Sequence, residues 1–127
     1  MKIKLYGTNS FTAKGQSACA MIDDTILFDC PPDLMKKLKN EPFDIKKIKA
    51  IVISHFHADH DFDLPMTLFF ANPLITIIAP RGATLRYKML CHLSHFTGAI
   101  STIDKCTIIE IDKKVLAEGV EIDGYKI

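Results

Sequence analysis

The N-terminal part of the chain alternates short apolar runs with turn residues, a pattern typical of β-strands. Strands are predicted at residues 2–6, 17–22 and 25–29, and Asp23-Asp24 predicts a hairpin turn between the last two. A fourth strand is predicted at 48–53, where β-branched residues dominate. Residues 74–79 are apolar without alternation, which indicates a strand buried on both faces of a sheet.

Helical periodicity separates and follows these strands. Helices are predicted at residues 32–40, 64–71 and 84–95, and closing strands at 106–111 and 120–127. The last of these helices places Leu85, Met89 and Leu93 on one apolar stripe. Strands that alternate with helices predict an α/β layered fold, and residues 1–127 are the length of a single domain.

The composition and net charge exclude few classes of function. The chain has 48% hydrophobic and 24% charged residues and a net charge of +1, which argues against nucleic-acid binding by the charge of the whole protein. The basic residues concentrate in one stretch: Lys36, Lys37, Lys39, Lys46, Lys47 and Lys49. Such a run is most often a solvated face, and contact with a phosphate backbone is the alternative.

The cysteines and the N-terminus point to an intracellular, non-membrane protein. Cys19, Cys30, Cys91 and Cys106 are too widely spaced for a metal knuckle and match no disulfide framework, so reduced, buried thiols are expected. The start of the chain interleaves lysine with apolar residues and carries no predicted leader or membrane span, which favours the cytoplasm.

The strongest chemical signal is a cluster of histidines directly after the predicted strand at 48–53. The proposed metal ligands are His55, His57, Asp59 and His60. In an extended segment residues 55 and 57 point the same way and can share an ion, while Asp59 and His60 can reach a second one. Imidazole and carboxylate without thiolate are the ligands of hydrolytic sites that keep water on the metal. A histidine-rich loop without metal is the alternative.

The sequence His55-x-His57-x-Asp59-His60 after an apolar strand resembles the signature of the metallo-β-lactamase superfamily. The resemblance implies that His55 and His57 bind one ion, that Asp59 and His60 bind the other, and that Asp59 is also catalytic through proton transfer. It further implies that Asp29, at the end of the strand 25–29, lies behind the ligands without binding metal. Zinc is the default for the two divalent ions, with manganese and iron as alternatives.

The segment after the motif is similar to the ribonuclease Z and phosphodiesterase branch of that superfamily. Phe62-Asp63-Leu64-Pro65 stands where Phe-Gly-Leu-Pro is usual, with Asp63 as the departure. The expected function is therefore a two-metal phosphodiesterase that uses a metal-bound hydroxide on a nucleic acid or on a cyclic or small phosphodiester. A thioester or lactam hydrolase of the same fold, or a non-catalytic metal- or partner-binding module, is the alternative. His92 and His95 share a helix face but have no acidic partner, so packing at a helix end is favoured over metal binding.

The resemblance also implies a four-layer αβ/βα sandwich, of which residues 1–127 supply one half. The further metal ligands of that family would then lie beyond Ile127. Half of such a sandwich would leave one apolar sheet face uncovered. Three explanations stay open: the chain is a fragment of a longer enzyme, which is favoured; a second chain supplies the missing half; or the half domain associates with itself as a homo-oligomer and binds metal weakly.

Overall fold

The computed structural model describes residues 1–10 and 12–127, and its centre is a six-stranded sheet with the order β1-β2-β3-β4-β5-β6. The strands are β1 (Ile3–Gly7), β2 (Cys19–Ile22), β3 (Ile26–Phe28), β4 (Ala50–Val52), β5 (Thr76–Pro80) and β6 (Thr107–Ile111). The pairs β1·β2 and β2·β3 are antiparallel, and the pairs from β3 to β6 are parallel. The predicted α/β fold class is thus confirmed.

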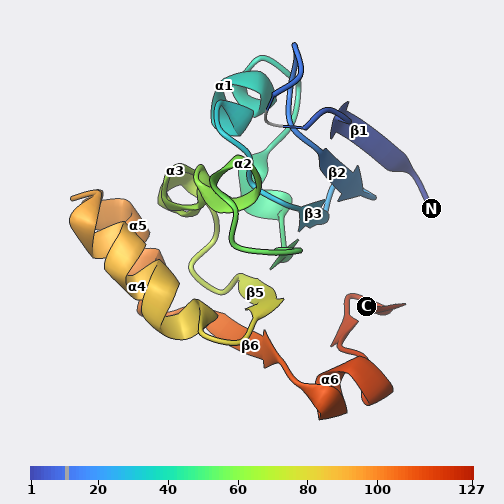
Figure 1. The fold of residues 1–127 in the computed structure, drawn as a ribbon, viewed down its shortest axis with the longest axis vertical. Coiled ribbons are helices and arrows are strands. Elements are labelled where there is room, and N and C mark those ends of the chain that lie inside the picture. The colour runs from blue at the N-terminus through green and yellow to red at the C-terminus, as the bar shows by residue number, and fades with distance from the viewer. Residues whose placement is uncertain (11) are drawn as a thin grey trace.

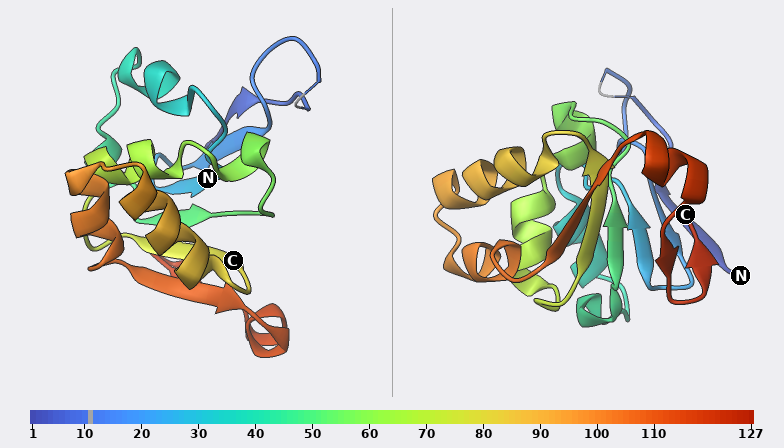
Figure 2. Two further views of the ribbon diagram at one scale, coloured as in Figure 1. Left: turned by 60° about the vertical axis from the view of Figure 1, so that its left-hand side comes forward. Right: turned by 90° about the horizontal axis from the view of Figure 1, so that it is seen from below.

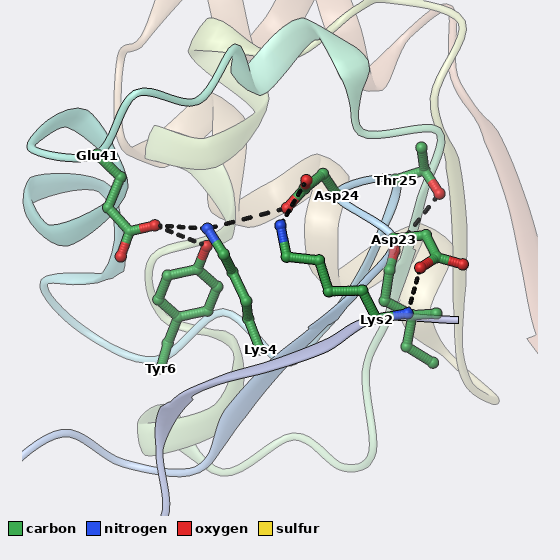
Figure 3. A network of polar contacts seen from close by, with 8 residues as sticks. Lys2, Lys4, Tyr6, Asp23, Asp24, Thr25 and Glu41 are labelled. Atoms are coloured by element: carbon green, nitrogen blue, oxygen red, sulfur yellow. Dashed lines mark hydrogen bonds and ion pairs between the residues drawn. The ribbon is translucent and has the colours of Figure 1, made fainter.

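The predicted hairpin turn joins β2 to β3. Asp23 and Asp24 have φ angles of 45° and 58°, the left-handed pair that a two-residue hairpin turn requires. Figure 3 shows how polar side chains tie this turn to β1 and to the segment after the first helix. Lys4 Nζ lies 3.0 Å from Glu41 Oε2 and 4.0 Å from Asp24 Oδ1, and the Tyr6 hydroxyl donates to the same glutamate oxygen over 3.3 Å.

Four helices cover one face of the sheet (Figure 1): α1 (Leu34–Lys39), α3 (Leu64–Phe70), α4 (Ala83–Leu93) and α5 (Thr97–Ile103). Leu27, Ile51 and Ile77 are cross-strand partners on β3, β4 and β5, and all three are 0% exposed within the core under these helices. Each fully buried aliphatic side chain of this kind stabilises the fold by about 1.5–3 kcal/mol. This row of side chains fixes the register of the strands that lead to the site.

The C-terminal segment lies on the other face. Figure 2 shows α6 (Lys113–Glu118), β7 (Glu121–Ile122) and β8 (Tyr125–Lys126) on the side of the sheet away from α4 and α5. The single strand predicted at 120–127 is wrong, because Asp123 and Gly124 have φ angles of 53° and 81° and reverse the chain into a hairpin. Lys49 Nζ lies 2.7 Å from Asp123 Oδ1 and fastens this hairpin to the start of β4.

Helix α4 is present as predicted, but it turns a different face to the core. Leu85, Met89 and Leu93 are 69%, 53% and 72% exposed, whereas Ala83, Tyr87 and Cys91 are the buried residues of this helix. None of the helices formed by residues 1–10 and 12–127 is long and apolar enough to cross a membrane.

Candidate metal centre

The residues of the histidine motif lie at one edge of the sheet, where two parallel strands end. β3 leads into Asp29, and β4 leads through Ile53 into Ser54 and the motif. Because parallel strands end at the same edge, residues that are 25 or more positions apart in sequence meet there. The backbone closes this contact, since Asp29 N donates to Val52 O over 2.9 Å.

The structure brings the predicted ligands together in one loop and one short helix. The ring centroids of His55 and His57 are 4.6 Å apart, and those of His55 and His60 are 4.0 Å apart. Asp59 and His60 lie on α2 (Ala58–Asp61), where His60 Nε2 is 3.5 Å from Asp59 Oδ2. All four side chains therefore belong to one cluster at the sheet edge.

Asp29 orients this cluster from behind. Its carboxylate accepts hydrogen bonds from Ser54 N and Ser54 Oγ, both over 2.8 Å, and lies 2.8 Å from His60 Nδ1. A carboxylate can only accept, so this contact places a ring proton on Nδ1 of His60 and turns Nε2 toward Asp59. A carboxylate that holds a histidine in this way is the usual support of a metal ligand.

The residues fit a divalent metal by donor chemistry and by the orientation of His60. Neutral imidazoles and a carboxylate suit zinc, manganese and iron, and His55 Nδ1 is also engaged, 3.0 Å from Ser54 Oγ. As the side chains lie, however, no group of three or more His, Cys, Asp or Glu residues in the described part of the chain is arranged to hold an ion. The motif thus supplies oriented donors without a closed coordination set.

A hollow of about 380 Å³ lies directly beside the motif and is lined by Ser10, Thr12, His57, Ala58 and Asp59. Its hydroxyl-bearing wall comes from the loop after β1, which the sequence indicates only as a glycine turn at Gly7. Ser and Thr hydroxyls are donors that bind phosphoryl or carbonyl oxygens. The hollow thus brings two hydroxyl side chains beside His57 and Asp59 of the motif.

Asp63, which departs from the glycine usual in the resembling family, has a structural contact. Its Oδ2 accepts a 2.8 Å hydrogen bond from Met35 N in the first turn of α1, and burial raises the pKa of its carboxyl group. The backbone adds two more links, from Cys30 N to His60 O over 2.6 Å and from Asp63 N to Cys30 O over 3.0 Å. The end of the motif is therefore fastened to the end of β3 and to α1.

The two other histidines and the four cysteines are not part of the motif cluster. His92 and His95 are exposed at the end of α4. Cys19, Cys30 and Cys91 are buried and Cys106 is half-buried, all as free thiols, and burial raises the pKa of Cys19 to about 12.

Several lysines of the basic stretch already have partners. Lys36 Nζ lies 2.6 Å from Asp33 Oδ1, Lys39 Nζ lies 3.8 Å from the centroid of the Phe70 ring, and Lys37 donates to Tyr6 O. Lys46 and Lys47 are exposed on the 3-10 turn η1 (Ile45–Lys47), which precedes β4, whereas the motif follows that strand. The two exposed lysines and the motif thus lie toward opposite ends of β4.

Comparison with known protein families gives a match over more than half of the chain. A family model described as anti-Pycsar protein Apyc1 matches residues 1–72. A ribonuclease Z from Picrophilus torridus is 34% identical over 105 residues, which cover 75% of this chain and 34% of that protein. A ribonuclease Z from Bacillus subtilis is 27% identical over 115 residues, which cover 80% of this chain and 38% of that protein. The chain thus spans about a third of the length of these curated relatives.

Solved structures extend the likeness to three dimensions. The short form of human tRNase Z superposes with a TM-score of 0.63 at 27% identity, over 75% of this chain and 40% of that chain. A diphosphatase from the PhnP family gives a TM-score of 0.57 at 24% identity, over 86% and 40%. The metallo-β-lactamase fold protein YhfI from Bacillus subtilis gives 0.60 at 16% identity, over 87% and 46%.

Proposed function

This chain belongs to the family described as anti-Pycsar protein Apyc1, in the ribonuclease Z-like branch of the metallo-β-lactamase superfamily, and on that basis we propose that it carries the metal-binding motif of a phosphodiester hydrolase. The observation that supports this most is the Asp29–His60 contact of 2.8 Å, because it orients a motif histidine as a metal site requires. A purely structural histidine loop has no need of such a buried carboxylate.

The proposed centre takes two divalent ions, with zinc as the default and manganese or iron as alternatives. His55 and His57 would hold one ion, and Asp59 and His60 the other. Bound divalent metal supplies a hydroxide near neutral pH and a positive clamp on the phosphoryl oxygens. The resemblance to the metallo-β-lactamase superfamily implies further ligands from residues outside this chain. Within the described residues no group of three or more ligating side chains is arranged to hold an ion.

The chain's own residues then have distinct tasks. Asp29 and Ser54 hold the rings of His60 and His55 in place through the hydrogen bonds described above. Asp59 lines the 380 Å³ hollow beside His57, so its carboxylate is positioned to take a proton from the reacting centre or return one. Ser10 and Thr12, which line the same hollow, would donate hydrogen bonds to the substrate's non-reacting oxygens.

For the substrate we favour a small or cyclic phosphodiester over a long nucleic acid. Ribonuclease Z and tRNase Z are named for RNA substrates, and the PhnP-family structure is described as a diphosphatase, so the names of the relatives do not decide. The lysines do favour the small substrate: Lys36 and Lys49 are paired with carboxylates at 2.6 and 2.7 Å. The exposed Lys46 and Lys47 precede β4, toward the strand end away from the motif, so they do not form a track leading to it.

The test is hydrolysis of bis(p-nitrophenyl) phosphate, with added Zn²⁺ or Mn²⁺, by a protein that carries residues 1–127 together with the further ligands, beside a thioester and a chromogenic lactam. The proposal predicts metal-dependent phosphodiester cleavage that His55→Ala abolishes and that the matched control His92→Ala, an exposed histidine outside the motif, retains. Preferential cleavage of the thioester or lactam would contradict the phosphodiesterase assignment. Metal binding without turnover of any ester would support the non-catalytic module instead.

A further inference from the structure

Arg86 on helix α4 contacts the segment that carries the histidine motif. Its guanidinium forms a two-point ion pair with Asp61, with Nε 2.7 Å from Oδ2 and Nη2 3.0 Å from Oδ1. Nη2 also donates to the backbone carbonyl of Phe56 over 3.2 Å. The guanidinium carbon lies 5.1 Å from the centroid of the Phe56 ring.

These contacts join both ends of the ligand segment. Phe56 lies between His55 and His57, the ligands proposed for one ion, and Asp61 directly follows His60, a ligand proposed for the other. A single planar side chain therefore fixes the separation between the two ligand pairs. Lysine cannot reproduce this geometry, because its ammonium group is a point charge without the fixed fork of a guanidinium.

The ion pair is buried at its acidic end. The Asp61 side chain is 0% exposed and that of Arg86 is 34% exposed. A buried carboxylate is tolerated only when its charge and oxygens are paired, so the position of Asp61 depends on Arg86. Tyr87 packs behind the pair, with its ring edge-to-face against Phe56 at 5.9 Å, so the segment has little room to move.

We infer that Arg86 is a positioning residue for the metal centre: it holds the Phe56 carbonyl and Asp61 at once and thereby sets where His55, His57 and His60 lie relative to one another. The expected effect of Arg86 on metal affinity rests on the proposed function. The effect of Arg86 on the arrangement of the histidine rings does not need metal, so it can be measured in the metal-free chain.

The test compares four variants of the chain. Arg86→Met removes the fork and keeps most of the apolar stem, and Arg86→Lys keeps the charge alone. Asp61→Leu with Arg86→Met replaces the whole pair by apolar side chains, a change that is often neutral or stabilising for buried pairs. Lys88→Met, an exposed cation on the same helix, is the matched control.

The first measurement is the ¹⁵N chemical shifts of the histidine ring nitrogens in the metal-free chain. Arg86→Met, Arg86→Lys and the double variant should all shift the resonances of His55, His57 and His60, and Lys88→Met should leave them in place. The second measurement is Co²⁺ affinity with its visible absorption spectrum. Here the same three variants should bind about 10–100-fold more weakly, the loss typical of removed outer support.

The double variant separates positioning from stability. If it recovers the thermal midpoint of the wild type and still shows shifted rings and weakened Co²⁺ binding, Arg86 acts by placing the ligands. Recovery of ring shifts and affinity together with stability would overturn the inference, as would unchanged shifts in Arg86→Met. Absence of Co²⁺ binding by the wild-type chain would count against the proposed function alone, because the metal-free ring shifts still decide the role of Arg86.

Discussion

Removal of the Asp29 carboxylate should weaken both the fold and the metal site, by amounts that the structure lets us separate. Asp29 is 8% exposed and has a φ angle of 62°, in the left-handed region that Asp and Asn tolerate better than Ala. Asp29→Ala loses the carboxylate and that backbone preference together. Asp29→Asn keeps the backbone preference and one accepting oxygen, and loses the charge.

The expected magnitudes follow from the three hydrogen bonds to Ser54 N, Ser54 Oγ and His60 Nδ1. A hydrogen bond to a charged group contributes about 1.5–3 kcal/mol, but Ser54 is exposed and water replaces part of its loss, so we count about 1 kcal/mol each. A left-handed alanine costs roughly 1–2 kcal/mol. Asp29→Ala should therefore lower the free energy of unfolding by about 4–5 kcal/mol and Asp29→Asn by about 1–2 kcal/mol.

The assay is urea unfolding of the metal-free chain followed by circular dichroism, together with zinc affinity from competition with a chromophoric chelator. Both variants should bind zinc about 10–100-fold more weakly, because Asp29→Ala removes the oxygen that accepts from the His60 ring and Asp29→Asn removes its negative charge. Asp33→Ala is the matched control for the backbone term, since Asp33 has a φ angle of 65° and an exposed carboxylate paired with Lys36. It should lose stability by roughly 1–2 kcal/mol without a change in zinc affinity. Unchanged zinc affinity in Asp29→Ala would refute the orienting role of Asp29.

Three further changes test other parts of the structure. Glu110 accepts two backbone hydrogen bonds at the start of α4, and these lower the pKa of its carboxyl group, so the stabilisation is present above the pKa of the unfolded state and is lost as pH falls through the pKa of the folded state. Glu110→Gln should therefore have a lower thermal midpoint than the wild type at pH 7, and this difference should vanish in acid. A difference that persists in acid would contradict the cap. Gly98→Ala would place a Cβ atom 2.8 Å from the ring of Phe69, so it should lower the free energy of unfolding in urea by about 1–3 kcal/mol. The second substitution Phe69→Leu should restore the lost stability. A loss that Phe69→Leu does not restore would count against this clash. The buried Tyr87 hydroxyl makes no hydrogen bond of ordinary geometry with the described residues, although burial and then the nearby Asp61 carboxylate raise its pKa. Tyr87→Phe should therefore change the free energy of unfolding by no more than about 1 kcal/mol, and a larger loss would show that the hydroxyl is engaged with Asp61.

The sequence predicted the central strands and the position of the histidine motif well, because local patterns of residues determine both. The apolar runs at 25–29 and 48–53 and the Asp23-Asp24 turn correspond to β3, β4 and the hairpin before them. The strand end placed the histidines at the sheet edge, and the family resemblance placed Asp29 behind them, as its contact with His60 confirms.

The orientation of α4 could not be predicted by the same means. Leu85, Met89 and Leu93 recur every four residues, and so do Ala83, Tyr87 and Cys91, so periodicity offered two faces. The larger aliphatic face was the natural choice. The core instead takes the face whose small residues permit close packing around one large ring, and this choice depends on helices and strands distant in sequence.

Asp61 and Arg86 were missed for a related reason. In the sequence, Asp61 is an ordinary acidic residue after the motif and Arg86 is an ordinary cation in a predicted helix. They are 25 positions apart, and only the fold brings them into contact. Sequence separation of this kind hides an ion pair from local pattern. The burial of the Asp61 carboxylate indicates a paired charge, and this burial is visible in the structure but not in a single sequence.

Zinc binding by the purified, tag-free chain tests most directly whether residues 55–60 form a metal site on this scaffold. Competition titration with a chromophoric chelator should show zinc bound to the wild type, binding lost or strongly weakened in His55→Ala, His57→Ala and His60→Ala, and binding retained in His92→Ala. A folded wild-type chain that binds no zinc, manganese or iron, or a His60→Ala variant that binds zinc as tightly as the wild type, would contradict the account.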